Sequence, residues 1–262
     1  MNHPSPKKVA HSLVAHGHER IDNYFWMNDR ENQDVIDHLN AENDYLDSVL
    51  ESTKSNQELL FKEMKGRIKE DDSSVPYFKN GYWYYSRYET GKEYPIHCRK
   101  LKSLENDEQI LIDENIDAQK HPYYDVVSFA ISKDNNIMAF AEDITGRRMY
   151  QIRFKNLKTN EIYPNILTNC SSDLAWHNDN NQLYFTEKDP ETLRPFLIRC
   201  HKLDTSVSRD IFEEEDDTFI TAVSISKDFG YLMIGSYSTL TTEFQIKSAS
   251  DDSGFEVFML RQ

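Results

Sequence analysis

The fold is decided by the stretch Val126–Phe140, which reads VVSFAISKDNNIMAF. In it an alternating strand runs into a polar turn, SKDNN, and a second strand follows. The same phrase returns at Leu174–Phe185 as LAWHNDNNQLYF and at Val223–Ile234 as VSISKDFGYLMI. A repeat of about 40–50 residues that is made of short strands is typical of a β-propeller, with one repeat per blade. The sequence therefore predicts a propeller.

The repeat predicts about four blades, each a small sheet of four strands. We place them at about 75–119, 124–167, 172–212 and 219–262. The first blade opens with a hairpin whose Asn80-Gly81 pair is typical of a type I′ turn. The last strand-like segment, 255–260, is followed by no strand that would complete a ring. Because each blade needs a neighbour to cover its faces, we expect an open, partial propeller.

Residues 1–72 precede the propeller and have a different pattern. We expect an extended polar segment and then two amphipathic helices, the first with apolar residues at helical spacing from about residue 30 to 51. Ser55 and Glu58 have the spacing of a capping box at the start of the second helix. A propeller is all strand, so these helices are expected to pack against a different body.

The composition narrows the class of protein. The net charge is −15, which argues against nucleic acid as a partner because phosphate binding needs a basic surface. Cys98, Cys170 and Cys200 are odd in number and widely spaced, so we expect reduced thiols. The sequence shows no signal peptide and no apolar run of membrane-spanning length, so we expect a cytoplasmic protein with no membrane partner. His16-Gly17-His18 lacks a third metal ligand, and we expect no metal and no cofactor.

One run of charges is a candidate functional site. Five carboxylates follow one another between the third and fourth blades: Glu213, Glu214, Glu215, Asp216 and Asp217. Like charges in a row repel each other and favour contact with solvent or with a cation. The run is therefore either a negative mouth that steers basic peptides or a solvated loop between blades.

Several separate stretches resemble the prolyl oligopeptidase family of serine peptidases, and most closely its oligopeptidase B branch, bacterial protease II. The resemblance covers the chain from about residue 16 to 260 and is carried by motifs that agree in order and spacing. They are His16-Gly17-x-x-Arg20-Ile21-Asp22-x-Tyr24-x-Trp26-Met27-x-Asp29, Glu42-Asn43-x-Tyr45, Pro76-Tyr77-x-Lys79-Asn80-Gly81-Tyr82, Ile137-Met138-Ala139-x-Ala141-Glu142-Asp143, Arg147-Arg148-x-Tyr150-x-Ile152-Arg153-Phe154-x-Asn156-Leu157 and Glu213-Glu214-x-Asp216-Asp217-Thr218. The family usually has Leu where this sequence has Met27.

The resemblance implies a seven-bladed propeller that covers the active site of an α/β-hydrolase domain and admits only short peptides. The oligopeptidase B branch cleaves after Lys or Arg. A hydrolase domain needs a GxSxG nucleophile turn, and residues 1–262 contain none. We therefore expect no catalytic residue in this chain, a fold that is dominated by β-strands with about four of seven blades after an α-helical arm, and no α/β-hydrolase domain.

Three functional hypotheses remain open. The chain is the N-terminal and propeller part of an oligopeptidase B-like peptidase, whose partners are short basic peptides and a hydrolase domain in cis or from a split gene. Alternatively, it is a non-catalytic propeller module that binds peptides or proteins. The third hypothesis is an inactive truncated product. The missing closing strand favours the first over the second.

Overall fold

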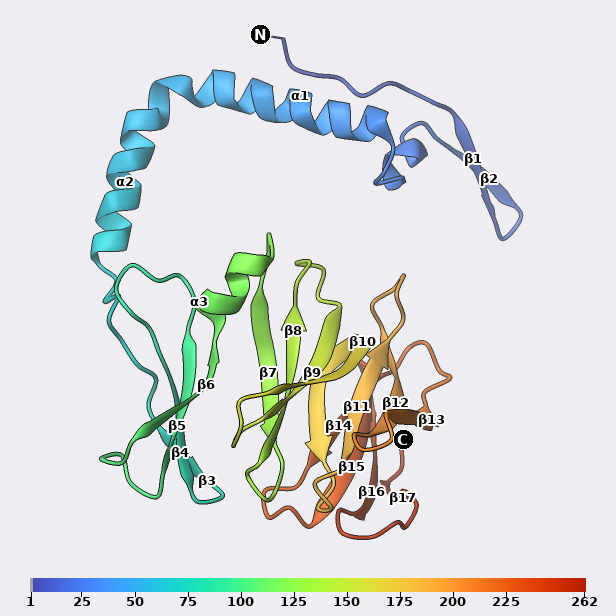
Figure 1. Cartoon of the computed structure of the whole chain (residues 1–262). Helices are drawn as coiled ribbons and strands as arrows, with labels where there is room; N and C mark the ends of the chain where they lie inside the picture. Colours follow the sequence, from blue (N-terminus) through green and yellow to red (C-terminus); the bar gives the residue numbers. More distant parts are fainter. Residues whose placement is uncertain (1) are drawn as a thin grey trace. The chain divides into compact units, whose positions relative to one another are not determined.

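The computed structural model describes residues 2–262, and these form two compact units, the first ending at Lys69 and the second running from Glu70 to Gln262 (Figure 1). In the first unit, β1 (His11–Ala15) and β2 (His18–Asp22) form an antiparallel hairpin. The sequence predicts only an extended segment there, so the hairpin is an addition to the predicted fold. The backbone turns at His16 and Gly17, whose φ angles are 51° and 78°, and glycine adopts such angles without strain.

Two helices follow the hairpin, as the apolar spacing predicted. After a short 3-10 turn, η1 (Phe25–Asn28), come α1 (Gln33–Leu50), η2 (Glu51–Thr53) and α2 (Lys54–Gly66). The Asn32 side chain caps α1 by accepting a hydrogen bond from the Asp34 amide. The predicted capping box does not form, because α2 already begins at Lys54 and Thr53 caps it with its backbone conformation alone.

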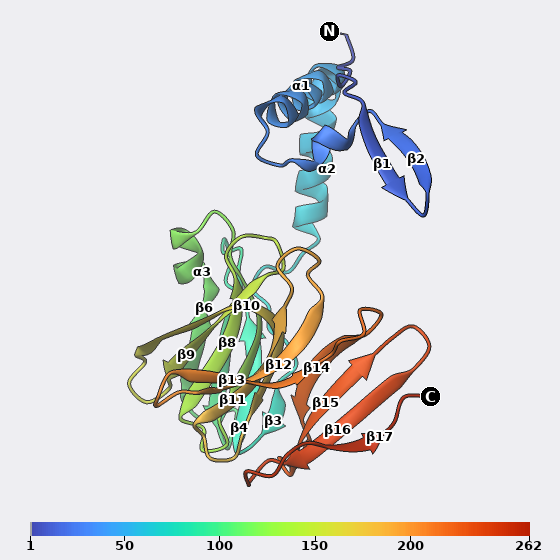
Figure 2. The ribbon, with the colours of Figure 1, turned by 90° about the vertical axis from the view of Figure 1, so that its right-hand side faces the viewer.

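The second unit consists of four antiparallel blades of four strands each. The first blade contains β3 (Tyr77–Lys79), β4 (Tyr82–Arg87), β5 (Ile96–Leu101) and β6 (Glu108–Asp113), and α3 (Glu114–Asp117) and η3 (Ala118–Lys120) lead to the second. The second and third blades are built from β7 (Asp125–Ile131), β8 (Ile137–Asp143), β9 (Tyr150–Asn156), β10 (Ile162–Trp176), β11 (Gln182–Lys188), β12 (Pro195–Lys202) and β13 (Val207–Glu213). The fourth contains β14 (Ile220–Ile225), β15 (Tyr231–Tyr237), β16 (Thr242–Ser248) and β17 (Glu256–Met259). Figure 2 shows this last blade beside the others.

The second and third blades share one strand. β10 pairs with β9 through its first part, up to Cys170, and with β11 through its last part, so that seven strands form one sheet. Its register shifts around Asn169, whose φ of 58° is left-handed. Such a β-bulge bends a strand without ending it. The strand therefore passes from the outer edge of one blade to the inner edge of the next.

The hydrophobic core lies between blades, because each sheet is covered by its neighbour. Tyr84 of the first blade packs with Met138 and Phe140 of the second. Phe154 of the second blade packs with Trp176 and Phe185 of the third. The third and fourth blades meet in the same way through another cluster, which consists of Ala175, Tyr184, Ile198, Cys200, Val223, Leu232, Ile234 and Ala249.

The turns that carry the repeated phrase tie the blades together at one end of the propeller (Figure 1). The Asn80 and Asn135 side chains bond to each other at 3.2 Å, which joins the first blade to the second. The Asn180 side chain accepts from the Asp134 amide at 2.9 Å, and that of Asn178 donates to the Phe229 carbonyl at 2.8 Å. The polar turn residues of the repeat therefore form hydrogen bonds that join adjacent blades.

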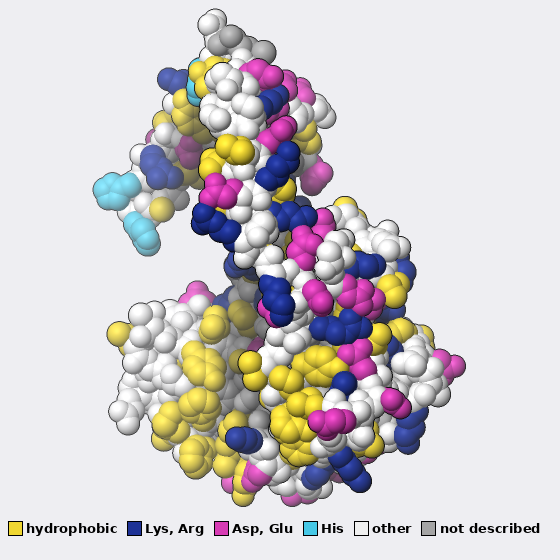
Figure 3. Space-filling view, turned by 90° about the vertical axis from the view of Figure 1, so that its left-hand side faces the viewer, with side chains coloured by type: hydrophobic (Ala, Val, Ile, Leu, Met, Phe, Trp, Pro, Cys, Tyr) yellow, Lys and Arg dark blue, Asp and Glu magenta, His cyan; other side chains and the backbone are white. Residues whose placement is uncertain are grey.

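The four blades do not close into a ring, and the fold class expected from the sequence is confirmed: β-strands dominate, a partial propeller follows the helical unit, and residues 2–262 form no α/β-hydrolase domain. Large hydrophobic side chains are exposed on the first and last blades, among them Phe78, Ile110 and Phe258. Figure 3 shows such side chains in patches on the propeller, with a recess between two of its lobes. In the part of the chain described, no helix is long and apolar enough to span a membrane.

Candidate functional site: the acidic loop between the third and fourth blades

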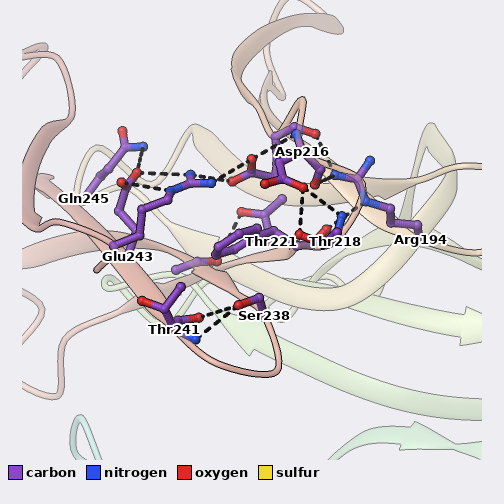
Figure 4. A network of polar contacts seen from close by, with 12 residues as sticks. Arg194, Asp216, Thr218, Thr221, Ser238, Thr241, Glu243 and Gln245 are labelled. Atoms are coloured by element: carbon purple, nitrogen blue, oxygen red, sulfur yellow. Dashed lines mark hydrogen bonds and ion pairs between the residues drawn. The ribbon is translucent and has the colours of Figure 1, made fainter.

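Arg194 holds the loop that carries the five carboxylates in place. It directly precedes β12, the third strand of the third blade. Its guanidinium donates to three backbone carbonyls, those of Glu214 at 2.7 Å, Asp216 at 2.6 Å and Phe219 at 2.7 Å. Figure 4 shows Arg194 beside Asp216 and Thr218. Arginine suits this task because its planar group presents five donors in a fixed geometry. The backbone of the loop is therefore held in one shape.

A second arginine neutralises one of the five acids. The Glu214 side chain is buried, with 4% of its surface exposed, and accepts from Arg261 at 2.8 and 3.3 Å. Arg261 also contacts the Glu243 carboxylate at 3.2 Å, and its guanidinium lies 4.2 Å from the ring centroid of Phe219. Burial pushes the pKa of Glu214 up, but the hydrogen bonds from Arg261, Ser236 and the Asp216 amide, together with the charge of Arg261, outweigh burial and lower the net pKa. Glu214 is therefore a charged, paired group of the interior.

The other four carboxylates are exposed. Glu213 ends β13, and Glu215 and Asp217 point into solvent. The Asp216 carboxylate accepts from the hydroxyl and the amide of Thr218, at 2.7 and 3.0 Å, and these bonds lower its pKa. The structure thus brings the five predicted residues into one loop but divides them into a buried anchor, a turn-forming group and three free charges.

Arg194 and Arg261 are the two residues of this site that sequence reasoning missed. They lie 20 and 47 residues from Glu214 in the chain. No local pattern links a lone arginine to a carbonyl at such a distance. The two guanidinium charges offset part of the negative field of the loop, so the steering that five carboxylates suggested is reduced to the exposed ones.

The first blade brings together a serine, a histidine and a glutamate. Ser86 Oγ lies 3.0 Å from His97 Nδ1, and His97 Nε2 lies 2.7 Å from Glu114 Oε1. A serine nucleophile also needs exposure on a strained turn and donors for an oxyanion. Ser86 lies within the regular β4–β5 pairing, and the second Glu114 oxygen accepts from the Val126 amide at 3.0 Å. This chain of bonds joins two blades and offers no centre for acyl transfer.

The described residues contain no group of three His, Cys, Asp or Glu side chains that could hold a metal ion. His16 and His18 lie at the β1–β2 hairpin, exposed to solvent. The three cysteines are buried and unpaired, as their number and spacing predicted.

Comparisons with known proteins identify this architecture. Residues 4–261 match the model of the prolyl oligopeptidase N-terminal β-propeller domain. The chain is 39% identical to dipeptidyl aminopeptidase BI of Pseudoxanthomonas mexicana, over 99% of this chain and 39% of the relative, and 30% identical to Protease 2 of Moraxella lacunata, over 94% and 37%. Oligopeptidase B from Leishmania major superposes with a TM-score of 0.93 at 27% identity and covers all of this chain and 40% of its own.

The chain thus spans about two fifths of the length of the relatives that it matches. The match runs without a break from the helical unit to the fourth blade, which agrees with the motifs quoted above. The matching family model and the superposed structure both assign the chain to the same N-terminal propeller domain. The chain belongs to the prolyl oligopeptidase family, of which it holds the N-terminal β-propeller domain.

Proposed function

We propose that this chain is the propeller part of an oligopeptidase B-like serine peptidase that hydrolyses short peptides after Lys or Arg. The propeller restricts access to an α/β-hydrolase domain, which is joined to it in cis or supplied by a separate gene. The observation that carries the proposal is the superposition on oligopeptidase B from Leishmania major over the whole chain, supported by the identity to Protease 2. The chemistry is acyl transfer by a Ser-His-Asp triad outside these residues.

A second candidate is the release of dipeptides from a free N-terminus. It is favoured by the higher identity, 39%, to a dipeptidyl aminopeptidase. The two candidates differ in whether the substrate's amino group is recognised. They share the same fold and the same catalytic step, so they are separated by substrate and not by structure.

Two assays test these proposals. The native product is detected in source cells with an antibody against residues 1–262, and a species much heavier than this chain is expected. The purified product is then given an Arg-containing peptide with a free or an acetylated N-terminus. Cleavage of both after Arg supports the endopeptidase, and cleavage of the free form alone, two residues from its end, supports the dipeptidyl activity. A native species of 262 residues that cleaves neither peptide leaves the binding-module and inactive-product hypotheses.

The exposed carboxylates of the loop are proposed to attract basic peptides toward the propeller. Glu213, Glu215 and Asp217 support this role because they are exposed to solvent. We also propose a cytoplasmic location, which the three free, buried cysteines support because unpaired thiols are usual in a reducing compartment.

A further inference from the structure

Phe229 has a left-handed backbone conformation at a turn position where the second and third blades have asparagine. In the turns of the second and third blades, the same position holds Asn135 and Asn180, with φ angles of 63° and 60°. Phe229 has a φ of 61°. Asparagine tolerates this left-handed region, whereas a bulky aromatic residue there is an outlier. A strained residue of this kind points to a function that requires its side chain.

The Phe229 ring lines a cavity of about 130 Å³ at the inner edges of the four blades. Aromatic side chains from four strands form its walls, namely Tyr77 of β3, Tyr84 of β4, Phe129 of β7 and Trp176 of β10. Pockets for small ligands are usually apolar, with a few polar groups that fix the orientation of the ligand. If residue 229 were asparagine, as at the matching positions of the second and third blades, this side of the cavity would have no aromatic wall.

Lys79 supplies the only charge among the side chains that line the cavity. Its ammonium lies 5.4 Å from the Phe229 ring centroid, and within the described part of the chain no carboxylate forms an ion pair with it. The three acids of the repeated turns accept hydrogen bonds within their own turns: Asp134 from Ser132, Asp179 from Gln182, and Asp228 from Ser226. Lys79 is therefore the one group in this lining that offers a positive charge to the carboxylate of a ligand.

A second positive group lies behind the cavity wall. Arg99 is buried, pairs with Tyr84 across the β4–β5 ladder and donates to the carbonyl of Asn135 at 3.0 Å. The amides of Asn80 and Asn135, which also line the cavity, are bonded to each other and to the Lys133 carbonyl. The lining thus offers aromatic surface and the positive charge of Lys79.

We propose that this cavity binds the C-terminal residue of a peptide, with an apolar or aromatic side chain among the rings and the terminal carboxylate on Lys79. The choice of a peptide rests on the proposed function, because peptides are the molecules that the family handles. The volume of the cavity, about 130 Å³, suits one aromatic ring. The carboxylate is selected by Lys79, which is exposed and can move onto it.

Calorimetric titration of the purified chain with N-acetyl-alanyl-phenylalanine tests the proposal without any turnover, so its failure is distinct from failure of the peptidase assay. We expect saturable binding and at least tenfold weaker binding of the C-terminal amide. Lys79→Met should lose tenfold or more in affinity. Lys133→Met, which removes an exposed lysine from the adjacent turn, should bind as the parent does.

Phe229→Asn separates function from stability. It installs the residue that the sister turns use, so its melting temperature should equal or exceed that of the parent while peptide binding is lost. Unchanged binding by Phe229→Asn or Lys79→Met overturns the proposal, and so does equal binding of the acid and the amide. Equal binding of phenylacetate and the dipeptide assigns the cavity to free aromatic acids and overturns the peptide assignment.

Discussion

Glu214 and Arg261 form a two-point ion pair, at 2.8 and 3.3 Å, across the two ends of the fourth blade. Glu214 lies in the loop that enters the blade, and Arg261 follows β17, the strand that leaves it. Arg261 reaches Glu243 of β16 as well. The pair therefore clamps the first and the last strand of this blade in one position.

Replacing Arg261 by Met should destabilise the second unit by about 1–3 kcal/mol, because it leaves the buried Glu214 charge without a partner. The lower end of this range allows for Arg261, which is partly exposed to water. Urea unfolding followed by circular dichroism measures the change. Glu213→Gln, an exposed neighbour, is the control and should change the midpoint little. An unfolding midpoint for Arg261→Met equal to that of the control would contradict the role of the clamp.

The same pair should make stability depend on pH. The pKa of Glu214 in the folded chain is lower than its ordinary value of about 4.5, so the unfolded chain binds its proton first as the pH falls. The stabilisation is complete above pH 4.5 and is lost as the pH falls through the lower, folded pKa. Between pH 6 and pH 3 the parent should lose more stability than Arg261→Met, and the two curves should converge. Parallel curves would show that the pair does not titrate with unfolding.

Asn135 is expected to contribute to stability in two ways, through its bonds to Asn80 and through its tolerance of a left-handed backbone. Asn135→Ala should cost about 1–2 kcal/mol, since it loses both. Asn135→Gly keeps the backbone freedom and should cost less. Thermal unfolding of the two variants separates the contributions, and an alanine variant as stable as the glycine variant would assign the whole effect to the side-chain bonds.

Reversing the charge of Glu213, Glu215 and Asp217 to Lys should raise KM for Arg-containing peptides several-fold in the complete peptidase and leave kcat unchanged, because the effect is on encounter. The difference should vanish in high salt, which screens exposed charges. Glu214 and Asp216 are left in place because they hold the loop. An unchanged KM at low salt would remove the steering role.

The three thiols should be unreactive in the folded chain. Cys98, Cys170 and Cys200 are each at most 1% exposed, and burial raises the pKa of all three, that of Cys98 to about 12. A thiol reagent should label none of them in native buffer and all three in urea. Rapid labelling of one cysteine under native conditions would show that its blade opens locally.

The sequence predicted the turns and helices, because these depend on the conformational preferences of residues that are close together in the chain. Asn80-Gly81 forms the expected turn with two positive φ angles, 45° and 84°, because these residues tolerate that conformation wherever they occur. The polar phrase of the repeat located the hairpins of the second, third and fourth blades for the same reason. Two helices follow from apolar spacing, although the capping box at Ser55 was wrong.

What the sequence could not predict depends on partners far along the chain. In the sequence nothing distinguishes Glu214 from its four acidic neighbours. Only the fold brings Arg261, 47 residues later in the chain, into contact with it. The break expected between the second and third blades is also absent, because residues 168–171 contain neither Gly nor Pro and the chain continues through a bulge at Asn169. The cavity is a third case, since its walls come from four blades.

The shared strand β10 has a mechanical consequence for the propeller. Because one continuous strand belongs to both the second and the third blade, a hinge between these two blades would have to break its backbone hydrogen bonds. The first and fourth blades are separate sheets, joined to their neighbours by side chains and turns. Relative motion of the blades is therefore expected at two places, between the first and second blades and between the third and fourth. The second and third blades are expected to move together as one body.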